Sequence, residues 1–437
     1  MKPKASYRQD LVAAIRQWFP TQFFAQWPLR RGLRWTPQRL VWLALLMAWS
    51  AEQTLGERFE AACDLLGSLF PGWNLGGTYT GFAVALRAWS DPLRPAVANR
   101  LRRQMQACAG RHWLREGWCA LAADGSRLEC PRTAANEKGL GCAGKERTGP
   151  QLYLTALWHM GLGLPWDYRI GPGTASERRH LEDMLADLPP RSLVVADAGF
   201  SGYDLYTRIK AAGHSFLLRV GANVHLLSRL GYVEREGADT VYLWPEGRRD
   251  QPPVVLRLVV LARGKQNMYL LTDVLDEAAL PRASAALLYE MRWGVEVFFR
   301  SCKQTLQRRR MLSRGPGQAR EELAWAVLGL WLLGVMSTAA LIARGADPLS
   351  WSVAAARRRL RRAVRRAGGD ERPRGRVSLV AELAEAVKDG YQRQGSKKAR
   401  DWPHKKREKP PGDPNIREAT PQEVRRAKRL RAKLERN

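Results

Sequence analysis

The spacing of apolar residues changes along the chain, and each spacing predicts a different kind of element. Up to about residue 110 the pattern is helical, and Thr36 is suited to cap a helix that has Pro37 at its first position and runs to Trp49. From about residue 115, short apolar runs alternate with polar segments, which indicates strands connected by helices. The chain is therefore predicted to begin with a helical region and to continue as an α/β domain.

The α/β region is predicted to have the order β-β-β-α-β-α-β. The expected strands cover residues 118–123, 151–160, 165–170, 192–196 and 215–220, and the expected helices cover residues 174–188 and 202–212. This order indicates a mixed sheet flanked by helices. The first and fourth strands are expected to end at Asp124 and Asp197, which puts two carboxylates at strand ends, where ligands bind in open α/β sheets.

Three further segments follow. Residues 221–280 are rich in strand patterns and read as a β insertion within the α/β domain, and a long helix is expected from residue 283 to about residue 309. Residues 323–343 then run without a charge, which is long enough to span a bilayer. A fully buried core helix predicts the same pattern. The core helix is favoured because the preceding helix carries polar residues in a catalytic type of pattern.

The charge of the chain changes the picture, because 72 Lys and Arg against 42 Asp and Glu leave a net charge of +30. Such an excess predicts a polyanionic partner, either nucleic acid or an anionic membrane surface. More than half of the excess lies after residue 356, with basic clusters at residues 357–362 and 405–407. This region is predicted to be a partly disordered, nucleic-acid-binding arm.

The cysteines and the N-terminus indicate a cytoplasmic protein. The six cysteines show neither a C-x-x-C pair nor the spacing of a disulfide framework, so they are expected to be reduced thiols. The first residues contain no apolar segment of the kind found in signal peptides.

A third carboxylate, Glu296, strengthens the case for an acidic site. On the helix expected at 283–309, Tyr289, Arg292, Glu296 and Lys303 project within about 60° of one another. A solvated helix with an Arg292–Glu296 ion pair would also account for this stripe. That simpler explanation does not account for the two strand-end carboxylates upstream.

The spacing Tyr289-x2-Arg292-x3-Glu296-x6-Lys303 resembles the YREK signature of DDE transposases of the insertion sequence four family. The segments LAADGSRLE around Asp124 and VVADAGFSGYDL around Asp197 resemble the first and second acidic motifs of that family. The resemblance covers roughly residues 115–340. It implies a ribonuclease-H-like fold with a β insertion between the second Asp and the Glu, in agreement with the strand-rich residues 221–280.

With this resemblance, five regions are expected. They are a helical DNA-binding domain (1–112), the first part of the catalytic domain (113–220), the β insertion (221–280), the catalytic and buried helices (281–345), and the basic, partly disordered C-terminal region (346–437).

The resemblance implies that Asp124, Asp197 and Glu296 are the catalytic residues and hold two Mg²⁺ ions, with Mn²⁺ able to replace them. Hard carboxylate oxygens suit such ions, and two ions about 3.5–4 Å apart can activate the attacking oxygen and stabilise the leaving one. Tyr289, Arg292 and Lys303 would hold DNA phosphates, and Arg219 is a further candidate contact. The implied partners are transposon-end DNA and target DNA, bound by a homodimer on paired ends, without a membrane, in the bacterial cytoplasm at the nucleoid.

One departure from the family concerns the hairpin step of some relatives, in which a Trp just before an LLT segment stacks on a flipped base. Here Met268 occupies the corresponding position before Leu270-Leu271-Thr272, with Tyr269 beside it. This departure puts the stacking step in doubt, and Tyr269 as a substitute stacking residue is a hypothesis.

Three alternatives remain open at this point. The first is a domesticated transposase that binds DNA without cleaving it, and the second is a ribonuclease-H-like nuclease that hydrolyses DNA without strand transfer. The third is a basic membrane-surface protein anchored through residues 323–343.

Overall fold

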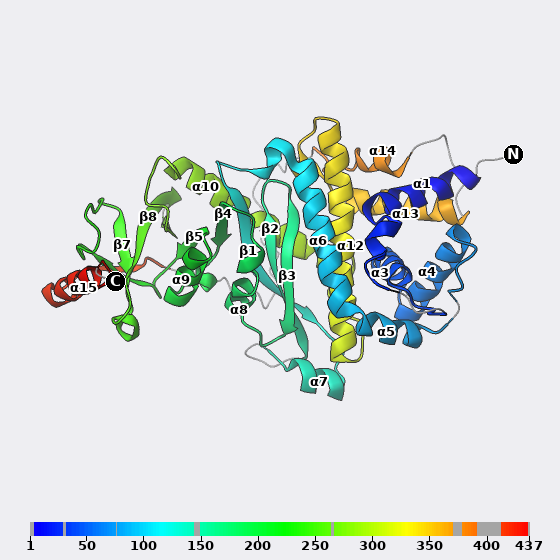
Figure 1. Cartoon of the computed structure of the whole chain (residues 1–437), viewed down its shortest axis with the longest axis horizontal. Helices are drawn as coiled ribbons and strands as arrows, with labels where there is room; N and C mark the ends of the chain where they lie inside the picture. The colour runs from blue at the N-terminus through cyan, green and yellow to red at the C-terminus, as the bar shows by residue number, and fades with distance from the viewer. Residues whose placement is uncertain are drawn as a thin grey trace.

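The computed structural model describes residues 4–28, 32–75, 77–143, 149–263, 266–369, 378–390 and 412–435. Within these ranges a ten-stranded sheet with the order β10-β6-β7-β8-β9-β5-β4-β1-β2-β3 forms the backbone of the molecule. A group of helices that includes α1, α3, α4 and α13 lies at one end of the molecule, and α15 lies at the other (Figure 1).

The centre of the sheet is the α/β core predicted from the sequence. It consists of β1 (Cys119–Glu129), β2 (Gln151–His159), β3 (Leu164–Pro172), β4 (Ser192–Ala196) and β5 (Ser215–Val220). Strands β1, β4 and β5 are parallel, whereas β2 pairs antiparallel with both β1 and β3. Every residue of β4 is buried, as expected of a parallel strand that is covered on both faces. The order β3-β2-β1-β4-β5 is the ribonuclease-H-like arrangement, so the predicted fold class is confirmed.

Short helices lie between these strands in the sequence. They are α8 (Glu177–Glu182) before β4 and α9 (Tyr203–Ala211) between β4 and β5, and α7 (Ala134–Leu140) lies between β1 and β2. Helices α10 (Arg282–Met291) and α11 (Trp293–Arg300) follow the sheet in sequence, and α11 contacts β1 and β2. The helix expected at 174–188 is therefore shorter, since a 3₁₀ turn at Leu185–Asp187 follows α8.

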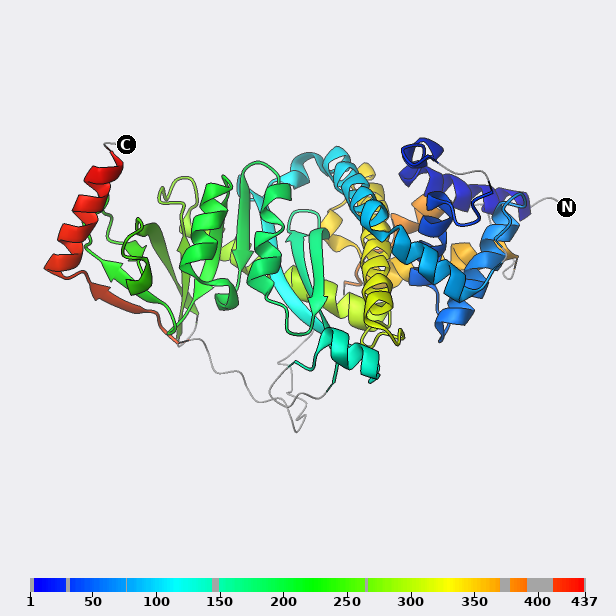
Figure 2. The ribbon, with the colours of Figure 1, turned by 60° about the horizontal axis from the view of Figure 1, so that its bottom comes forward.

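Residues 221–280 extend this core sheet. They form β6 (His225–Ser228), β7 (Thr240–Leu243), β8 (Val254–Arg263) and β9 (Gln266–Thr272), and β9 joins the core by pairing antiparallel with β5. Strand β10 (Asn415–Glu418) adds to β6 in parallel, and α15 (Pro421–Leu434) follows it with a capping box at Thr420 and Glu423. Figure 2 shows α15 packed beside the insertion strands.

The helical end of the molecule joins segments from both ends of the chain. The N-terminal part supplies α1 (Lys4–Trp18), α2 (Thr21–Phe24), α3 (Pro37–Trp49), α4 (Leu55–Leu69), α5 (Tyr79–Ala88) and α6 (Ser90–Ala109), and the C-terminal part supplies α13 (Val353–Gly368) and α14 (Leu379–Leu383). Helix α13 contacts α1, α4 and α14. The hydroxyl of Thr36 caps α3 by accepting from the N–H of Arg39, as predicted.

Helix α12 (Pro316–Ala343) contains the uncharged segment and joins the helices to the sheet. It is the one helix in the described ranges that is long and apolar enough to cross a membrane, and 83% of its most apolar window is buried inside the protein. It runs beside α6 (Figure 1) and also contacts α3 and β3. The indole N–H of Trp49 donates to the carbonyl of Gly329 over 2.9 Å, which brings α3 close to this helix. The structure thus places residues 323–343 in the core.

The structure corrects the predicted bounds of one strand and one helix near the site. Strand β1 does not end at Asp124 but continues to Glu129, because β2 keeps pairing with it up to the pair Glu129–Gln151. The helix expected at 283–309 is divided into α10, α11 and a π-helical turn at Ser301–Thr305. The break between α10 and α11 lies next to Gly294, which has low helix propensity and packs closely against Trp158.

Parts of the C-terminal region form regular elements within the described residues. Residues 353–368 form α13, whose buried Ala356, Leu360 and Ala367 pack into the main core, and residues 412–435 form β10 and α15. The dense arginines of α13 conceal these widely spaced apolar positions in the sequence. The cluster at 405–407 lies outside the described residues.

Candidate active site

Three neighbouring strands place Asp124, Asp197 and Arg219 side by side. The last parallel pairs are Ala123 with Ala196 and Ala196 with Leu218, so the next residue on each strand continues the same row. Asp197 keeps an extended backbone with φ −84° and ψ −177°. Because paired residues of adjacent strands point to the same face, the three side chains share one face of the sheet. The sequence-predicted convergence of the two aspartates therefore follows from strand register.

The two aspartates are each held by a glycine N–H. Gly125 donates to Oδ1 of Asp124 and Gly199 donates to Oδ1 of Asp197, both over 2.8 Å. Neither glycine has room for a side chain. A Cβ on Gly125 would clash with the hydroxyl of Tyr153, and a Cβ on Gly199 would lie 2.8 Å from Oε1 of Glu177.

The sequence reasoning missed the pair that fills this space. The hydroxyl of Tyr153 on β2 donates to Oε2 of Glu177 on α8 over 2.5 Å. This pair lies against Gly125 on β1 and Gly199 in the turn after β4, and so it limits how the backbone beside each aspartate can move. The only sequence signal was an acidic residue early in the helix expected at 174–188.

Helix α11 brings Glu296 to the same site, together with Arg292, which lies between α10 and α11. The guanidinium of Arg292 lies 3.9 Å from Oδ2 of Asp124 and 3.3 Å from Oε1 of Glu296. It also lies over the ring of Tyr289, 5.5 Å from the centroid. Arg292 therefore links the strand carboxylate to the helix carboxylate and supplies a positive charge between them.

Burial disfavours ionisation of Asp124 and Glu296, the two carboxylates beside Arg292. Burial raises the pKa of Asp124 to about 7, opposed by the N–H of Gly125 and by Arg292 and reinforced by the charge of Asp197. Burial likewise raises the pKa of Glu296, although Arg292 opposes this shift. A pocket of acids with raised pKa values is a common feature of sites that bind cations or exchange protons.

The π-helical turn places Lys303 at the same site. Its ammonium donates to Oγ of Ser126, two residues beyond Asp124, over 2.7 Å. Burial lowers the pKa of Lys303. A π turn inserts an extra residue into a helix and is frequent at functional sites. The α-helical spacing placed Lys303 on the stripe with Glu296, and the π turn brings its ammonium to Ser126.

Tyr289 and Arg219 complete the group. Burial raises the pKa of Tyr289, and the positive charges of Arg292 and Arg219 oppose that rise. Seven of the eight residues selected from the sequence therefore lie around one site, namely Asp124, Asp197, Arg219, Tyr289, Arg292, Glu296 and Lys303.

The eighth residue, Tyr269, lies on the other face of the sheet. Leu270 pairs with Arg219, and Tyr269 pairs with Val220, the next residue along β5. Successive residues of a strand point to opposite faces, so Tyr269 points away from the row that contains Asp124, Asp197 and Arg219. Tyr269 is half-buried and packs against the main core.

Comparisons with known proteins indicate the family of the region that contains these residues. The family model described as the transposase DDE domain matches residues 117–332. Residues 117–332 belong to the transposase DDE domain family. This stretch contains the aspartate strands, the insertion, the Glu296 helix and most of α12.

Two curated relatives resemble parts of the chain. The transposase InsG for insertion sequence element IS4 of Escherichia coli (strain K12) is 27% identical over 257 residues, covering 55% of this chain and 57% of that protein. The putative transposase y4zB of Sinorhizobium fredii (strain NBRC 101917 / NGR234) is 29% identical over 150 residues, covering 32% of this chain and 41% of that protein. The chain thus spans about half the length of the curated relatives it matches. The predicted similarity to insertion sequence four transposases is confirmed at the level of the DDE domain.

A similar solved structure is the piggyBac transposase synaptic complex with hairpin DNA. It has a TM-score of 0.40 and 10% sequence identity, and the alignment covers 90% of this chain and 87% of that chain.

DDE transposase domains depend on divalent metal ions, and the donor atoms of this site fit such an ion. Asp124, Asp197 and Glu296 offer hard carboxylate oxygens, and the raised pKa of Asp124 reflects a buried acid without enough positive charge around it. Within the described ranges, no three His, Cys, Asp or Glu side chains are gathered closely enough to hold an ion. Arg292 lies between Asp124 and Glu296 instead.

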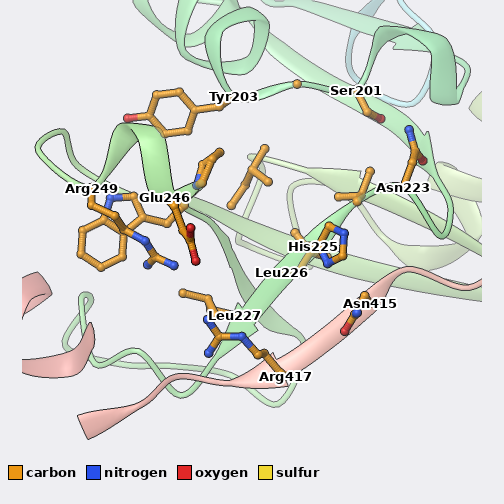
Figure 3. Close-up of a pocket in the computed structure, with 15 residues that line it drawn as sticks. Ser201, Tyr203, Asn223, His225, Leu226, Leu227, Glu246, Arg249, Asn415 and Arg417 are labelled. Carbon is orange, nitrogen blue, oxygen red and sulfur yellow. The ribbon is translucent and has the colours of Figure 1, made fainter. Parts of the chain in front are cut away.

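A cavity of about 540 Å³ adjoins the loop after Asp197 (Figure 3). Ser201 and Tyr203 lie on one side of it, and His225 on β6 with Asn415 and Arg417 on β10 lie on the other. The C-terminal segment therefore supplies one wall of a cavity next to the DDE site.

Proposed function

We propose that the protein is a DNA transposase that cleaves DNA at the ends of a mobile element and joins those ends to target DNA. The observation that supports this most directly is the row of Asp124 and Asp197 at the ends of adjacent parallel strand pairs. Arg292, at the start of α11, and Glu296 on that helix face this row. A DDE domain match over the same residues supports the same reaction class.

Both steps of the proposed reaction are in-line displacements at phosphorus. In cleavage, a water oxygen forms the new bond to phosphorus, the bond to the 3′ oxygen breaks, and that oxygen takes up a proton. In joining, the freed 3′ hydroxyl attacks a target phosphodiester and loses its proton, and the target 3′ oxygen leaves. Two Mg²⁺ ions, replaceable by Mn²⁺, would be held by Asp124 together with Asp197 and Glu296 and would lower the energy of the attacking and leaving oxygens.

The basic side chains of the site suit a phosphate substrate. Arg292 is fixed by Asp124, Glu296 and the ring of Tyr289, so it offers a preoriented guanidinium next to the acids. Lys303 is held by Ser126, and Arg219 extends the row on β5. We infer that these groups position the strand and offset the charge that develops on the phosphate.

The substrate and setting are part of the same proposal. The substrates are transposon-end and target DNA, and the active form is a homodimer on paired ends in the bacterial cytoplasm. The net charge of +30 favours association with DNA in general.

The experiment that tests the proposal is cleavage of element-end DNA by Glu296→Gln, with Glu290→Gln as the control. Gln has the shape of Glu but binds a divalent ion poorly. Changes outside the ligands already cost about 10–100-fold, so loss of a ligand is expected to reduce cleavage by at least about 100-fold. Glu290 is an exposed carboxylate on the adjacent helix, and its variant should cleave normally.

The outcomes separate the alternatives. Metal-dependent 3′ ends that join to target DNA support the transposase. Cleavage without joining indicates a nuclease, and DNA binding without cleavage by the unmodified chain indicates a domesticated binding protein. Equal cleavage by Glu296→Gln and Glu290→Gln would remove Glu296 from the site.

A further inference from the structure

A second cavity, of about 490 Å³, lies between the end of α3, helix α4 and helix α13. It is formed by segments from opposite ends of the chain, and no residue of the DDE site lines it. Its polar lining includes Ser50, Arg58, Ser68 and Arg361, and the carboxylates of Glu52 and Asp64 are exposed at its rim.

Two arginines of this cavity lack the partners that such groups normally have. Arg58 is 4% exposed, and although its Nε donates to the carbonyl of Glu52 over 2.7 Å, its Nη1 has no hydrogen-bond partner. Arg361 is half-buried and has no hydrogen bond or ion pair within the part of the chain that the structure describes. Burying a guanidinium N–H group without an acceptor lowers the stability of the fold. The unpartnered groups of this cavity therefore indicate a ligand that accepts from them.

Two more buried arginines lie behind the cavity and increase its positive charge. Arg308 donates to the carbonyls of Leu306 and Met47, and Arg357 donates to those of Thr305 and Ser50. The Nε atom of each has no partner. Burial, together with the positive charges of neighbouring arginines, lowers the pKa of both guanidinium groups to about 10.

The nearby carboxylates do not balance this charge. Glu322 accepts hydrogen bonds from the backbone N–H groups of Leu312 and Ser313, and Glu52 is exposed to solvent. The acids beside these four arginines are thus either exposed to solvent at the rim, as Glu52 and Asp64 are, or already hydrogen-bonded, as Glu322 is. This excess favours an anion, and arginine suits phosphate because its planar N–H groups match phosphate oxygens.

The outer face of α13 indicates a polyanion rather than a single ion. Arg358, Arg362 and Arg365 are exposed and recur every three or four residues, so they form a row about 10 Å long that begins beside the cavity and ends at Arg365 in its lining. One phosphate would engage only the cavity. A DNA strand would place further phosphates along this row.

We propose that this cavity is a phosphate-binding site for the backbone of bound DNA, with Arg58 and Arg361 donating to one phosphate. The proposal rests on the proposed function in that its ligand is DNA, but it concerns a site distinct from the DDE residues. Because Arg357 also donates to the carbonyl of Thr305, two residues after Lys303, the occupied site would adjoin the turn that carries Lys303.

The first test compares the thermal midpoints of the full chain, Arg361→Gln and Arg359→Gln with and without inorganic phosphate. Arg359 lies on the same helix and removes the same charge, but it pairs with Glu385 away from the cavity. Phosphate should raise the midpoints of the unmodified protein and Arg359→Gln but not that of Arg361→Gln. Without phosphate, Arg361→Gln should be at least as stable as the unmodified chain, because a half-buried, unpaired charge is removed. A clear loss of stability would indicate a structural arginine and overturn the proposal.

The second test measures DNA affinity against salt concentration for the same three proteins. Loss of one phosphate contact lowers the slope of log K against log salt by about 0.9. Arg361→Gln should show this decrease relative to Arg359→Gln. A phosphate-dependent midpoint with equal slopes would mean that the site takes free phosphate and not DNA, and equal behaviour in both tests would mean that there is no phosphate site.

A final comparison separates this inference from the proposed function. Metal-dependent cleavage by the unmodified chain tests the proposed function, whereas the salt slopes of Arg361→Gln and Arg359→Gln test this site. If the unmodified chain binds DNA but does not cleave it, the proposed function fails while the salt slopes still test this site.

Discussion

At Asp124 the protein holds a carboxyl group in surroundings that oppose its ionisation. The side chain is 18% exposed, and it faces Asp197 along the row and Glu296 across it. Arg292 offsets only part of this effect, since the pKa of Asp124 still rises to about 7. In the metal-free site, burial and the neighbouring carboxylates therefore destabilise the ionised form of Asp124, and a bound divalent ion would stabilise it.

We expect Asp124→Asn to change how stability depends on pH in metal-free protein. A raised pKa means that the folded state binds the proton more tightly than the unfolded state. The resulting stabilisation is complete below about pH 4 and is lost as pH rises through about 7. Urea unfolding in a chelator should show this loss in the unmodified chain but not in Asp124→Asn, which at pH 8 should be more stable by as much as about 4 kcal/mol.

The control for this measurement is Asp91→Asn, which removes a fully exposed carboxylate. It should keep the pH dependence of the unmodified chain. Mg²⁺ should then stabilise the unmodified chain more at pH 8 than at pH 6, because protons compete with the ion. Identical pH profiles for Asp124→Asn and Asp91→Asn would contradict the assigned environment of Asp124.

Tyr269 offers a second prediction at the residue scale. Its pairing with Val220 places it on the face of the sheet opposite Asp197 and Arg219. Tyr269→Ala should therefore leave the rate of DNA cleavage at saturating DNA within about twofold, while Arg219→Gln lowers it. A cleavage defect in Tyr269→Ala as large as that of Arg219→Gln, in protein of unchanged thermal midpoint, would restore Tyr269 to the site.

Among the elements, α12 has glycines at the positions where other elements pack closely against it, and this packing requires the absence of a side chain. Gly329 receives the indole of Trp49, and a Cβ on Gly334 would clash with Leu164 of β3 and lie 3.1 Å from Trp351. These contacts explain why a helix with the composition of a membrane span packs here between the sheet and the N-terminal helices.

Gly334→Val should overpack this contact and lower the free energy of unfolding by about 1–3 kcal/mol. The matched control is Gly317→Ala on the same helix, where a Cβ meets only the side chain of Arg87 at 3.5 Å. That change should be neutral or stabilise by up to about 1 kcal/mol, since Ala favours helix. Denaturant unfolding measures both, and equal stability of the two variants would mean that α12 is not closely packed at Gly334.

At the scale of the whole molecule, the C-terminal segment 412–435 forms the edge of the sheet, next to strands that lie about 190 residues earlier in the chain. Strand β10 covers the edge of β6, and Ala427 of α15 completes a small core with Leu227, Leu230, Tyr242 and Trp244. Glu423 accepts from Arg249 and Arg417, each over 2.7 Å. Arg417 is the main cause that lowers the pKa of Glu423 to about 2.

Glu423→Gln is expected to loosen this docked segment. Hydrogen bonds to charged groups contribute about 1.5–3 kcal/mol, so hydrogen exchange of the Asn415 and Ala419 N–H groups should accelerate by at least about tenfold. Exchange within α13 should not change. In the unmodified chain the docking contribution should be present above about pH 4.5 and be lost as pH falls towards 2, because the pKa is lowered on folding.

Glu435→Gln is the control for this change, since Glu435 lies on the same segment and pairs with Arg431 at the exposed end of α15. It should leave exchange of β10 unaltered. If Glu423→Gln and Glu435→Gln behave alike, Glu423 does not hold the segment in place.

The local sequence was sufficient for the features that depend on neighbouring residues. Apolar runs such as SLVVA predicted the buried strand β4, the Thr36-Pro37 pair predicted the start of α3, and helical spacing placed Arg292 with Glu296. These features rest on backbone preferences and on side-chain period, which act over a few residues. The same reasoning selected the acidic residues that strand register then brought together.

Tertiary structure decided what depends on partners distant in sequence. Pairing with β2 carries β1 past Asp124, the π turn directs Lys303 to Ser126, and strand parity separates Tyr269 from the acids. The C-terminal arginines fold into α13 because Ala356, Leu360 and Ala367 find a core formed by segments from elsewhere in the chain. Packing and strand pairing between segments distant in sequence stabilise these conformations. The residues near each position therefore do not predict them.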